Sequence, residues 1–275
     1  MAFSDFHTHT VFSDGLSTVR EYVVAAREKG LLALGISDHS YTPFDTSYCM
    51  RPETHIELYE TTVREEAKRA YEEDGFSLLL GIEHDFGSTI DRARYDYTIG
   101  SVHYIFHKGE IFAVDNTPEE QRFGIDHVFG GNTLDFAKVY FEHLVKHAAQ
   151  NKPTFIGHLD LLAKYGNMNE SAPAYLAVVK EAIEEIVKHV PLFEVSAGAI
   201  IRGLRTVPYP APHLLSLLAD CGARVILSSD AHESSKLTYY FPEMLKILKA
   251  NGFHSVTRLT ANGEIEDTIE SLLTQ

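Results

Sequence analysis

The sequence predicts an α/β fold in which seven strands alternate with helices and form a barrel-like sheet. Short apolar runs alternate with amphipathic segments along the chain, and one run, Leu31–Ser37, is continuous, as is typical of a buried parallel strand. The length of 275 residues suits a (β/α) barrel, which commonly uses about 250 residues. An open doubly wound sheet is the alternative, and both folds place functional residues beyond the C-terminal ends of the strands.

The predicted strands are short apolar segments followed by polar residues. The first ends in His7-Thr8-His9, and its two imidazoles would share a face because side chains two apart in a strand point the same way. In chain order we expect strands at Phe3–His7, Leu31–Ser37, Phe76–Ile82, Tyr95–Val102, Thr154–Gly157, Leu192–Val195 and Arg224–Ser229.

The predicted helices lie between these strands. Thr18-Val-Arg-Glu21 is a capping box that opens an amphipathic helix ending at Gly30. Thr117-Pro118-Glu119-Glu120 combines an N-cap, proline at the first helical position and glutamate at the third. Further helices are expected at Glu53–Asp74, Asn132–Gln150, Ala172–His189, Pro212–Asp220 and Phe241–Asn251. Residues Tyr104–Val114 alternate around Lys108-Gly109 and predict a hairpin, and a short run, Ser255–Leu259, closes the pattern.

Composition limits the class of protein. There is no internal repeat or linker, so we expect one domain over residues 1–275. We expect no membrane span and no signal peptide, and the two cysteines favour a reducing, cytoplasmic setting. The net charge of −15 argues against binding of a nucleic-acid backbone, while the many carboxylates are compatible with metal binding. The oligomeric state is not readable from the sequence.

Histidines and carboxylates collect at the predicted strand ends. Five strands carry a histidine at or just after the C-terminal end, the third ends at Glu83, and Asp14 lies in the loop after the first. The candidate metal ligands are His7, His9, Asp14, His39, Glu83, His103, His158, Asp230 and His232. Imidazole and carboxylate ligands suit Zn²⁺, Mn²⁺ or Fe²⁺. The set exceeds one tetrahedral shell, so we expect two or three ions, with Glu83 able to bridge.

The other histidines are given no role. His143 and His147 are spaced i, i+4 without a metalloprotease pattern, and we expect them on a helix surface. His84 should point away from Glu83 across the strand. Asp85 and Cys49 are secondary candidates.

A metal cluster that activates water would act on an anionic substrate with the help of a nearby cation. Arg202, in the loop after the sixth strand, is the leading phosphate-binding candidate, since a guanidinium can fork onto phosphate oxygens. Arg205 and Lys164 are second choices. The polar, aromatic loop Tyr41–Arg51 is expected to cover the substrate, with Asp45 and Tyr48 as candidate contacts.

Several motifs resemble the PHP superfamily (polymerase and histidinol phosphatase). They are His7-Thr-His9, Asp38-His39, Gly81-Ile-Glu83, Gly100-Ser-Val-His103, Gly157-His158 and Ser229-Asp230-Ala-His232, in the order of that superfamily. Three longer stretches resemble the monofunctional histidinol-phosphate phosphatases: Ser37–Pro43, Gly157–Leu161 and Glu194–Gly203.

The resemblance implies a distorted, TIM-like (β/α)₇ barrel with three divalent metal ions. One ion would take His7, His9, Glu83 and Asp230, a second Glu83, His103 and His158, and a third Asp14, His39 and His232. Arg202 matches the phosphate-contacting arginine of the family. The implied activity is hydrolysis of L-histidinol phosphate to L-histidinol and phosphate, late in histidine biosynthesis. Asp230 would orient the attacking water or accept its proton, and Asp45 would pair with the substrate amine.

The chain departs from the family pattern at two places. Ser196-Ala197 stand where members tend to have Asn-Thr, and Ala163-Lys164 occupy a stretch where many place an arginine. Both changes touch the expected rim of the substrate site. Another small phosphate ester, such as a nucleotide or sugar phosphate, or a phosphodiester is therefore the alternative substrate. A non-catalytic metal-binding module is the alternative from a different class.

Overall fold

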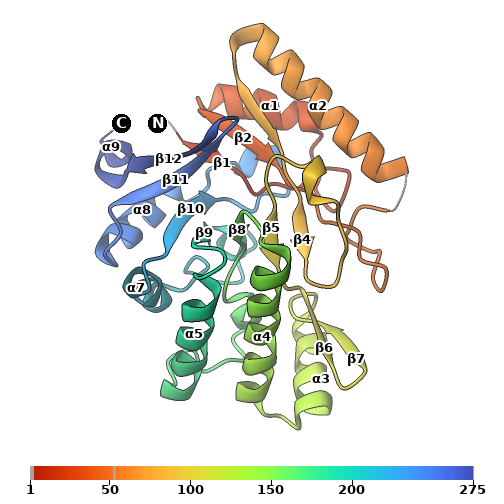
Figure 1. Ribbon diagram of the computed structural model, residues 1–275, viewed down its shortest axis with the longest axis vertical. Helices are drawn as coiled ribbons and strands as arrows, with labels where there is room; N and C mark the ends of the chain where they lie inside the picture. The colour runs from red at the N-terminus through yellow and green to blue at the C-terminus, as the bar shows by residue number, and fades with distance from the viewer. Residues whose placement is uncertain (1–2, 52–53, 275) are drawn as a thin grey trace.

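A computed structural model describes residues 3–51 and 54–274. Parallel strands occupy the centre, with helices around them (Figure 1). The central strands are β1 (Ser4–Asp5), β2 (Ala33–Ile36), β3 (Ser77–Leu80), β4 (Glu83–Asp85), β5 (Ile99–Ser101), β8 (Phe155–Ile156), β9 (Leu192–Ser196) and β10 (Arg224–Ser228). Each of the seven predicted strand segments overlaps at least one of them, and Glu83 to Asp85 continue the third segment as a separate strand. The predicted α/β class is confirmed.

The strands form two sheets with the orders β1-β2-β3 and β10-β9-β8-β5-β4. Isolated bridges between Thr8 and Ala231 and between His39 and Glu83 join them at two points. Within the described residues the ladders do not close into a barrel, because single bridges rather than paired strands span these two junctions. Both bridges lie just past strand ends, so the residues predicted to be functional also connect the sheets.

The helices are α1 (Val19–Glu28), α2 (Thr54–Asp74), α3 (Pro118–Phe129), α4 (Thr133–Asn151), α5 (Pro173–Ile186), α6 (Gly198–Ile201), α7 (Pro212–Asp220), α8 (Phe241–Ala250) and α9 (Ile269–Leu273). Short 3₁₀ turns are η1 (Arg92–Arg94), η2 (Leu161–Ala163) and η3 (Ser234–Lys236). The capping box at Thr18 and the N-cap at Thr117 are confirmed. The predicted start of the second helix, Glu53, lies outside the described residues.

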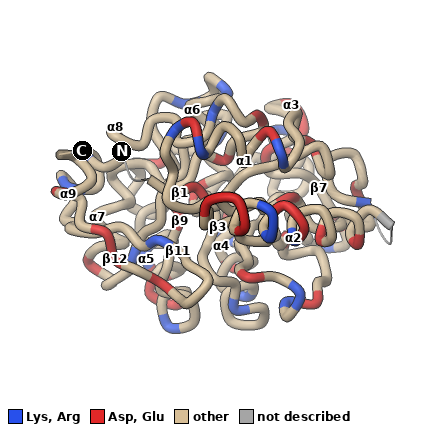
Figure 2. Tube along the Cα trace, turned by 90° about the horizontal axis from the view of Figure 1, so that it is seen from above, with Lys and Arg blue, Asp and Glu red and all other residues tan. Residues whose placement is uncertain are grey.

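The helices cover the strands in groups. Helices α3, α4 and α5 lie side by side on one side of the molecule, and α1 and α2 pack together on another (Figure 1). Acidic and basic segments both occur along α2 (Figure 2), where Arg27 of α1 pairs with Glu73 at 2.6 Å and with Asp74 at 2.8 Å. In the described part of the chain, no helix has both the length and the apolar character that crossing a bilayer requires.

Two antiparallel hairpins supplement the central sheets. β6 (Tyr104–His107) and β7 (Glu110–Ala113) form the predicted hairpin, with φ of 52° at Lys108 and 85° at Gly109, as a tight two-residue turn requires. β11 (Ser255–Thr260) pairs with β12 (Gly263–Thr268). β12 is not predicted from the sequence, because residues 263–268 are mostly polar and exposed and lack an alternating apolar face. The short helix α9 is not predicted either.

A buried tyrosine packs beneath the strand ends. Tyr97 is 2% exposed, and its hydroxyl donates to the carbonyl of Phe6 at 2.7 Å. A Cβ at Gly35 would lie 2.2 Å from the Tyr97 hydroxyl, and one at Gly81 would lie 2.1 Å from its ring. The two glycines therefore make room for the ring between β2 and the segment that joins β3 to β4.

The prediction that His143 and His147 lie on a helix surface is wrong. They do share one face of α4, but that face packs inward, and their exposed fractions are 4% and 0%. His147 donates from Nε2 to the carbonyl of His84 at 2.7 Å and accepts from Asn151 at Nδ1. His143 accepts from the backbone N–H of Phe106 at 3.1 Å. Burial lowers the pKa of each to about 4.

The depressed pKa of His147 predicts acid sensitivity. The unfolded chain takes up a proton on this imidazole below its ordinary pKa of about 6.5, whereas the folded protein does so only near 4. The stabilisation is therefore complete above pH 6.5 and is lost as the pH falls towards 4, at up to about 1.4 kcal/mol per pH unit. Urea unfolding at pH 7 and pH 5 measures this loss.

His147→Gln should show a smaller difference in the free energy of unfolding between the two pH values than the wild type. His127→Gln, at an exposed position on α3, is the control and should keep the wild-type difference. An unchanged pH dependence in His147→Gln would contradict this prediction.

Candidate metal centre

The structure brings all nine predicted ligand side chains together. His7 and His9 follow β1, His39 follows β2 and Glu83 begins β4. His103 follows β5, His158 follows β8, and Asp230 and His232 follow β10, while Asp14 comes from the loop before α1. These positions share one edge because parallel strands present their carboxyl ends on the same side.

Glu83 lies at the centre of the cluster and is 1% exposed. Its Oε2 atom lies 2.8 Å from His39 Nδ1 and 3.3 Å from His7 Nε2. Its Oε1 atom lies 2.9 Å from His158 Nε2 and 3.4 Å from His103 Nε2. Burial opposes ionisation of this carboxyl, but the charges of His7, His39 and His103 outweigh it and hold the Glu83 pKa well below its ordinary value. Glu83 can therefore face two cations at once.

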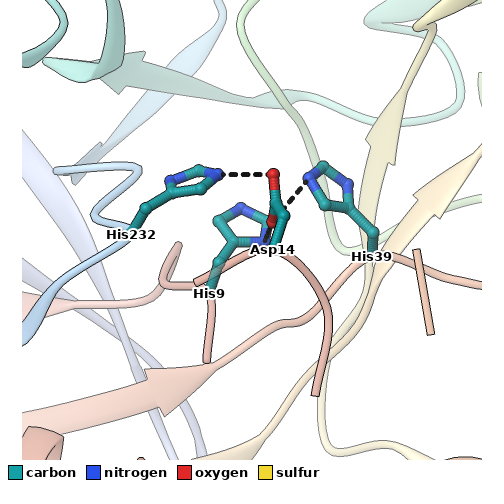
Figure 3. Close-up of side chains that lie close together, drawn as sticks. All are labelled: His9, Asp14, His39 and His232. Atoms are coloured by element: carbon teal, nitrogen blue, oxygen red, sulfur yellow. Dashed lines mark ion pairs between the residues drawn. The ribbon is translucent and has the colours of Figure 1, made fainter. Parts of the chain in front are cut away.

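A second group surrounds Asp14 (Figure 3). Asp14 lies 3.2 Å from His232 Nε2 and 3.6 Å from His39 Nε2, and the ring of His9 lies 4.2 Å from that of His39. Asp38 orders the preceding loop, because it accepts from the backbone N–H of Thr10 at 2.7 Å and from the hydroxyls of Thr10 and Ser13. Asp38 thus supports Asp14 without joining its group.

Asp230 links the cluster to Arg202. Its Oδ1 atom lies 3.4 Å from His9 Nε2, and its Oδ2 atom accepts from Arg202 Nη1 at 2.9 Å. A Cβ at Gly198 would lie 2.1 Å from Asp230 Oδ2 and 2.9 Å from Arg202 Nη1, so only glycine fits there. Arg202 caps the short helix α6, which the sequence did not predict, and this helix points the guanidinium back at Asp230.

The chemistry of the donors fits divalent metal ions. Among the described residues, the buried polar atoms that make no hydrogen bond include His7 Nε2 and both ring nitrogens of His9. Glu83 Oε2 also makes none, since its 2.8 Å contact with His39 Nδ1 lacks hydrogen-bond geometry. Such atoms are costly unless a cation meets them. Four groups hold their donor atoms within 4.8 Å of one another: His9-Asp14-His39-His232, His7-Glu83-His158, His7-His9-Asp230 and His39-Glu83-His103. The groups overlap, and together they offer more donors than one ion uses. The set contains nitrogen and oxygen but no thiolate, which suits zinc, manganese or iron.

Cys49 stays outside this set. It is buried, and its sulfur accepts from the backbone N–H and the hydroxyl of Thr42 at 3.3 Å each. The thiol therefore organises the loop Tyr41–Arg51.

The surroundings shift the pKa values of His103 and His9 in opposite directions. Burial disfavours the charged form of His103, but Glu83 and the hydrogen bond to Asp85 outweigh it and raise the His103 pKa to about 10. His9 is also fully buried, and the adjacent His39 and His232 add to the effect of burial, so its pKa is held well below the ordinary value. His9 therefore keeps a lone pair free for a metal ion, whereas His103 must exchange a proton for one.

Two further carboxylates accept hydrogen bonds from Nδ1 of clustered histidines whose Nε2 faces Glu83. Asp85, a secondary candidate in the sequence, accepts from His103 Nδ1 at 2.8 Å. Glu194, which the sequence reasoning missed, accepts from His7 Nδ1 at 2.6 Å. A signal for Glu194 was present, because a carboxylate within an apolar strand is rarely buried unless it is paired.

A cavity of about 230 Å³ opens over the cluster. Arg202, Lys164, Asp45 and Tyr48 line it, as do Tyr104, Asp115 and Tyr209, which the sequence did not single out. The Tyr104 hydroxyl donates to Asp45, whose second oxygen accepts from Ser47, and the ring of Tyr48 meets His39 edge-on at 4.8 Å. The cavity thus has a cationic guanidinium near the cluster and carboxylates elsewhere on its wall.

The two secondary cation candidates need correction. Lys164 lines the cavity, but its ammonium group is already bound to Asp115 at 2.8 Å. Arg205 is not among the lining residues. It pairs with Glu170 at 2.8 Å, and its guanidinium lies 5.1 Å from the centre of the Tyr209 ring. The partner Glu170 is distant in sequence, so the sequence does not show that the charge of Arg205 is already paired.

The chain is similar to several known proteins. A protein from Deinococcus radiodurans named "probable histidinol-phosphatase" is 28% identical over 265 residues, which cover 92% of this chain and 95% of that protein. A protein of the same name from Schizosaccharomyces pombe is 25% identical over 236 residues, covering 78% and 74%. The structure of histidinol phosphate phosphatase from Lactococcus lactis, which contains zinc, L-histidinol and phosphate, has a TM-score of 0.65 at 18% identity and covers 96% of this chain and 98% of that one.

A family model described as the PHP domain matches residues 5–196, which is more than half of the chain. The match includes seven of the nine clustered side chains, and β10 supplies the other two beyond it. The order of the motifs and the convergence of their side chains agree with this match. The chain belongs to the PHP domain family.

Proposed function

We propose that this protein is a metal-dependent phosphomonoesterase that hydrolyses L-histidinol phosphate to L-histidinol and phosphate in histidine biosynthesis. The cluster of buried, unpartnered nitrogen and oxygen donors beside Arg202, at the floor of a cavity, carries the proposal. The names of the two curated relatives and the L-histidinol and phosphate in the Lactococcus lactis structure support the substrate.

The cluster would hold divalent ions, and we propose three per chain, zinc, manganese or iron. His7, His9 and Asp230 would hold one, His103 and His158 a second, and Asp14, His39 and His232 a third, with Glu83 shared between the first two. Bound ions would lower the pKa of water to about 7 and stabilise charge on the phosphoryl oxygens.

The protein's own groups would then act on the phosphate. Arg202 can present two N–H groups to phosphate oxygens, and Asp230, 2.9 Å away, keeps the guanidinium in place. Asp230, which lies between Arg202 and His9, is placed to orient the attacking water or to accept its proton. Glu83 lies within 3.4 Å of four imidazole nitrogens and would fix the positions of these rings beside the bound phosphate.

We propose that Asp45, Tyr48 and Tyr104, which form one part of the cavity wall, determine which phosphate ester binds. Hydrogen bonds from Ser47 and Tyr104 outweigh the effect of partial burial and lower the pKa of Asp45, so it is anionic and able to pair with an amine. Asp115 is neutralised by Lys164 and is less suited to that role.

We propose one domain over residues 1–275 in which the seven strand segments form a distorted barrel. Free cysteines at 49 and 221 are typical of a reducing compartment and support a cytoplasmic setting.

Phosphate release from L-histidinol phosphate tests the function. Addition of Mn²⁺ or Zn²⁺ should support release, and a chelator should abolish it.

The double variant His7→Ala/His9→Ala should lose both activity and bound metal, whereas His127→Ala should keep both. Inductively coupled plasma mass spectrometry measures the metal content. If a panel of phosphate esters showed a preference for a nucleotide or sugar phosphate, the alternative substrate would be favoured. If the protein bound metal but released phosphate from no ester, a non-catalytic metal-binding module would be favoured.

Arg202→Ala should reduce kcat/KM for L-histidinol phosphate by about 100-fold or more, because a donor aimed at developing charge is removed. Arg202→Lys should recover little, since an ammonium group cannot fork onto two oxygens. Arg92→Ala, which removes an exposed arginine, is the control for loss of charge. Steady-state kinetics would refute the role if kcat/KM were unchanged.

Asp45→Asn should raise KM for L-histidinol phosphate by about ten-fold or more, because it removes a charge-assisted hydrogen bond to the amine. Hydrolysis of p-nitrophenyl phosphate, which has no amine, should change little. Asp126→Asn on the exposed side of α3 is the control. Equal effects on the two esters would exclude pairing of Asp45 with the amine.

A further inference from the structure

Glu194 is a fully buried carboxylate that contacts the cluster without belonging to any of its donor groups. It lies in β9, and its side chain reaches three neighbouring segments. Its Oε1 atom accepts from His7 Nδ1 at 2.6 Å and from the Ser228 hydroxyl, and its Oε2 atom accepts from the backbone N–H of His158 at 2.7 Å. Both oxygens are thus fully engaged by donors.

The contact with His7 defines which ring nitrogen is free. A neutral imidazole carries one proton, and a carboxylate at 2.6 Å from Nδ1 places that proton on Nδ1. The lone pair is then on Nε2, which is buried, has no hydrogen-bond partner and lies 3.3 Å from Glu83 and 3.9 Å from Asp230. The ring is therefore oriented to offer Nε2 to the centre of the cluster.

The contact with His158 acts on the neighbouring strand. Oε2 of Glu194 holds the backbone at the point where β8 ends and the His158 ring turns towards Glu83. The group around Asp14 is different, because none of Asp14, His39 and His232 is hydrogen-bonded to Glu194 in the described part of the chain. The hydrogen bonds of Glu194 to the cluster are therefore confined to His7 and His158, which would serve the first and second of the three proposed ions.

We propose that Glu194 is a positioning residue that fixes the Nδ1–H tautomer of His7 and the place of His158, and so sets metal affinity at the sites that these two residues serve, and not at the site of Asp14, His39 and His232. This inference rests on the metal centre of the proposed function. Loss of a carboxylate that accepts a hydrogen bond from a metal-binding histidine typically weakens metal binding by about 10- to 100-fold. We expect an effect of that size here.

Glu194→Gln is the sharpest substitution, because it preserves the size of the side chain. An amide has only one acceptor oxygen, so it cannot accept from both His7 and His158 as the carboxylate does. Asp160→Asn is the matched control. Asp160 is also 0% exposed and accepts a backbone N–H, that of Ala211, but it contacts none of the nine clustered side chains through a hydrogen bond or ion pair in the described part of the chain.

Metal titration of the metal-free full chain, with Zn²⁺ in competition with a fluorescent chelator, measures the affinity of each class of site. We expect Glu194→Gln to bind one class about 10- to 100-fold more weakly and another class unchanged, and Asp160→Asn to match the wild type. Uniform weakening of all classes, or unchanged affinity, would overturn the proposal. Substrate is absent, so a failure to hydrolyse L-histidinol phosphate would leave this result intact.

A second measurement covers the case in which Glu194→Gln does not fold. Nitrogen-15 NMR of histidine in the zinc-loaded wild-type protein reports the tautomer of each ligand. His7, assigned by its loss in His7→Gln, should carry its proton on Nδ1 and bind zinc through Nε2. Binding through Nδ1 would overturn the proposal without any substitution at Glu194.

Discussion

The structure depends on one buried carboxylate that faces several imidazoles. Glu83 is almost completely inaccessible, yet four ring nitrogens from four different strand segments lie between 2.8 and 3.4 Å from its two oxygens. Such a group is stable only if positive charge meets it. The strands must therefore end in register around Glu83, and the isolated bridge between Glu83 and His39 shows that the backbone itself pairs at this point.

The residues around the cluster fall into two sets, one that holds the clustered side chains in place and one that shapes the cavity. On the side of the cluster away from the cavity, Glu194, Asp85 and Asp38 hold His7, His103 and the loop of Asp14 in position. In front of them, Arg202 and the loop Tyr41–Arg51 shape the cavity. Most of these groups are acidic, so the negative net charge of the chain is partly concentrated where cations are expected.

Local patterns explain why much of the fold and the cluster could be predicted. The cap at Thr18 and the apolar run at Leu31–Ser37 involve only neighbouring residues, and the edge shared by parallel strands then brought the nine side chains together. The rest depended on contacts distant in sequence. Spacing put His143 and His147 on one face of α4 but did not reveal that this face packs inward.

Long-range pairing also explains the other differences. Nothing near Arg205 in the sequence indicates that Glu170 neutralises it, and nothing near Glu194 indicates that His7, 187 positions away, is its partner.

The packing of Tyr97 against Gly35 and Gly81 has an evolutionary consequence. A Cβ at either glycine would fit only if the side chain at position 97 were smaller than tyrosine. A smaller side chain at position 97, with both glycines kept, would leave a void and an unpaired Phe6 carbonyl next to His7. No single replacement at these three positions keeps the packing, so they should drift through paired substitutions. Covariation among positions 35, 81 and 97 would then record how closely relatives preserve the support beneath the clustered histidines.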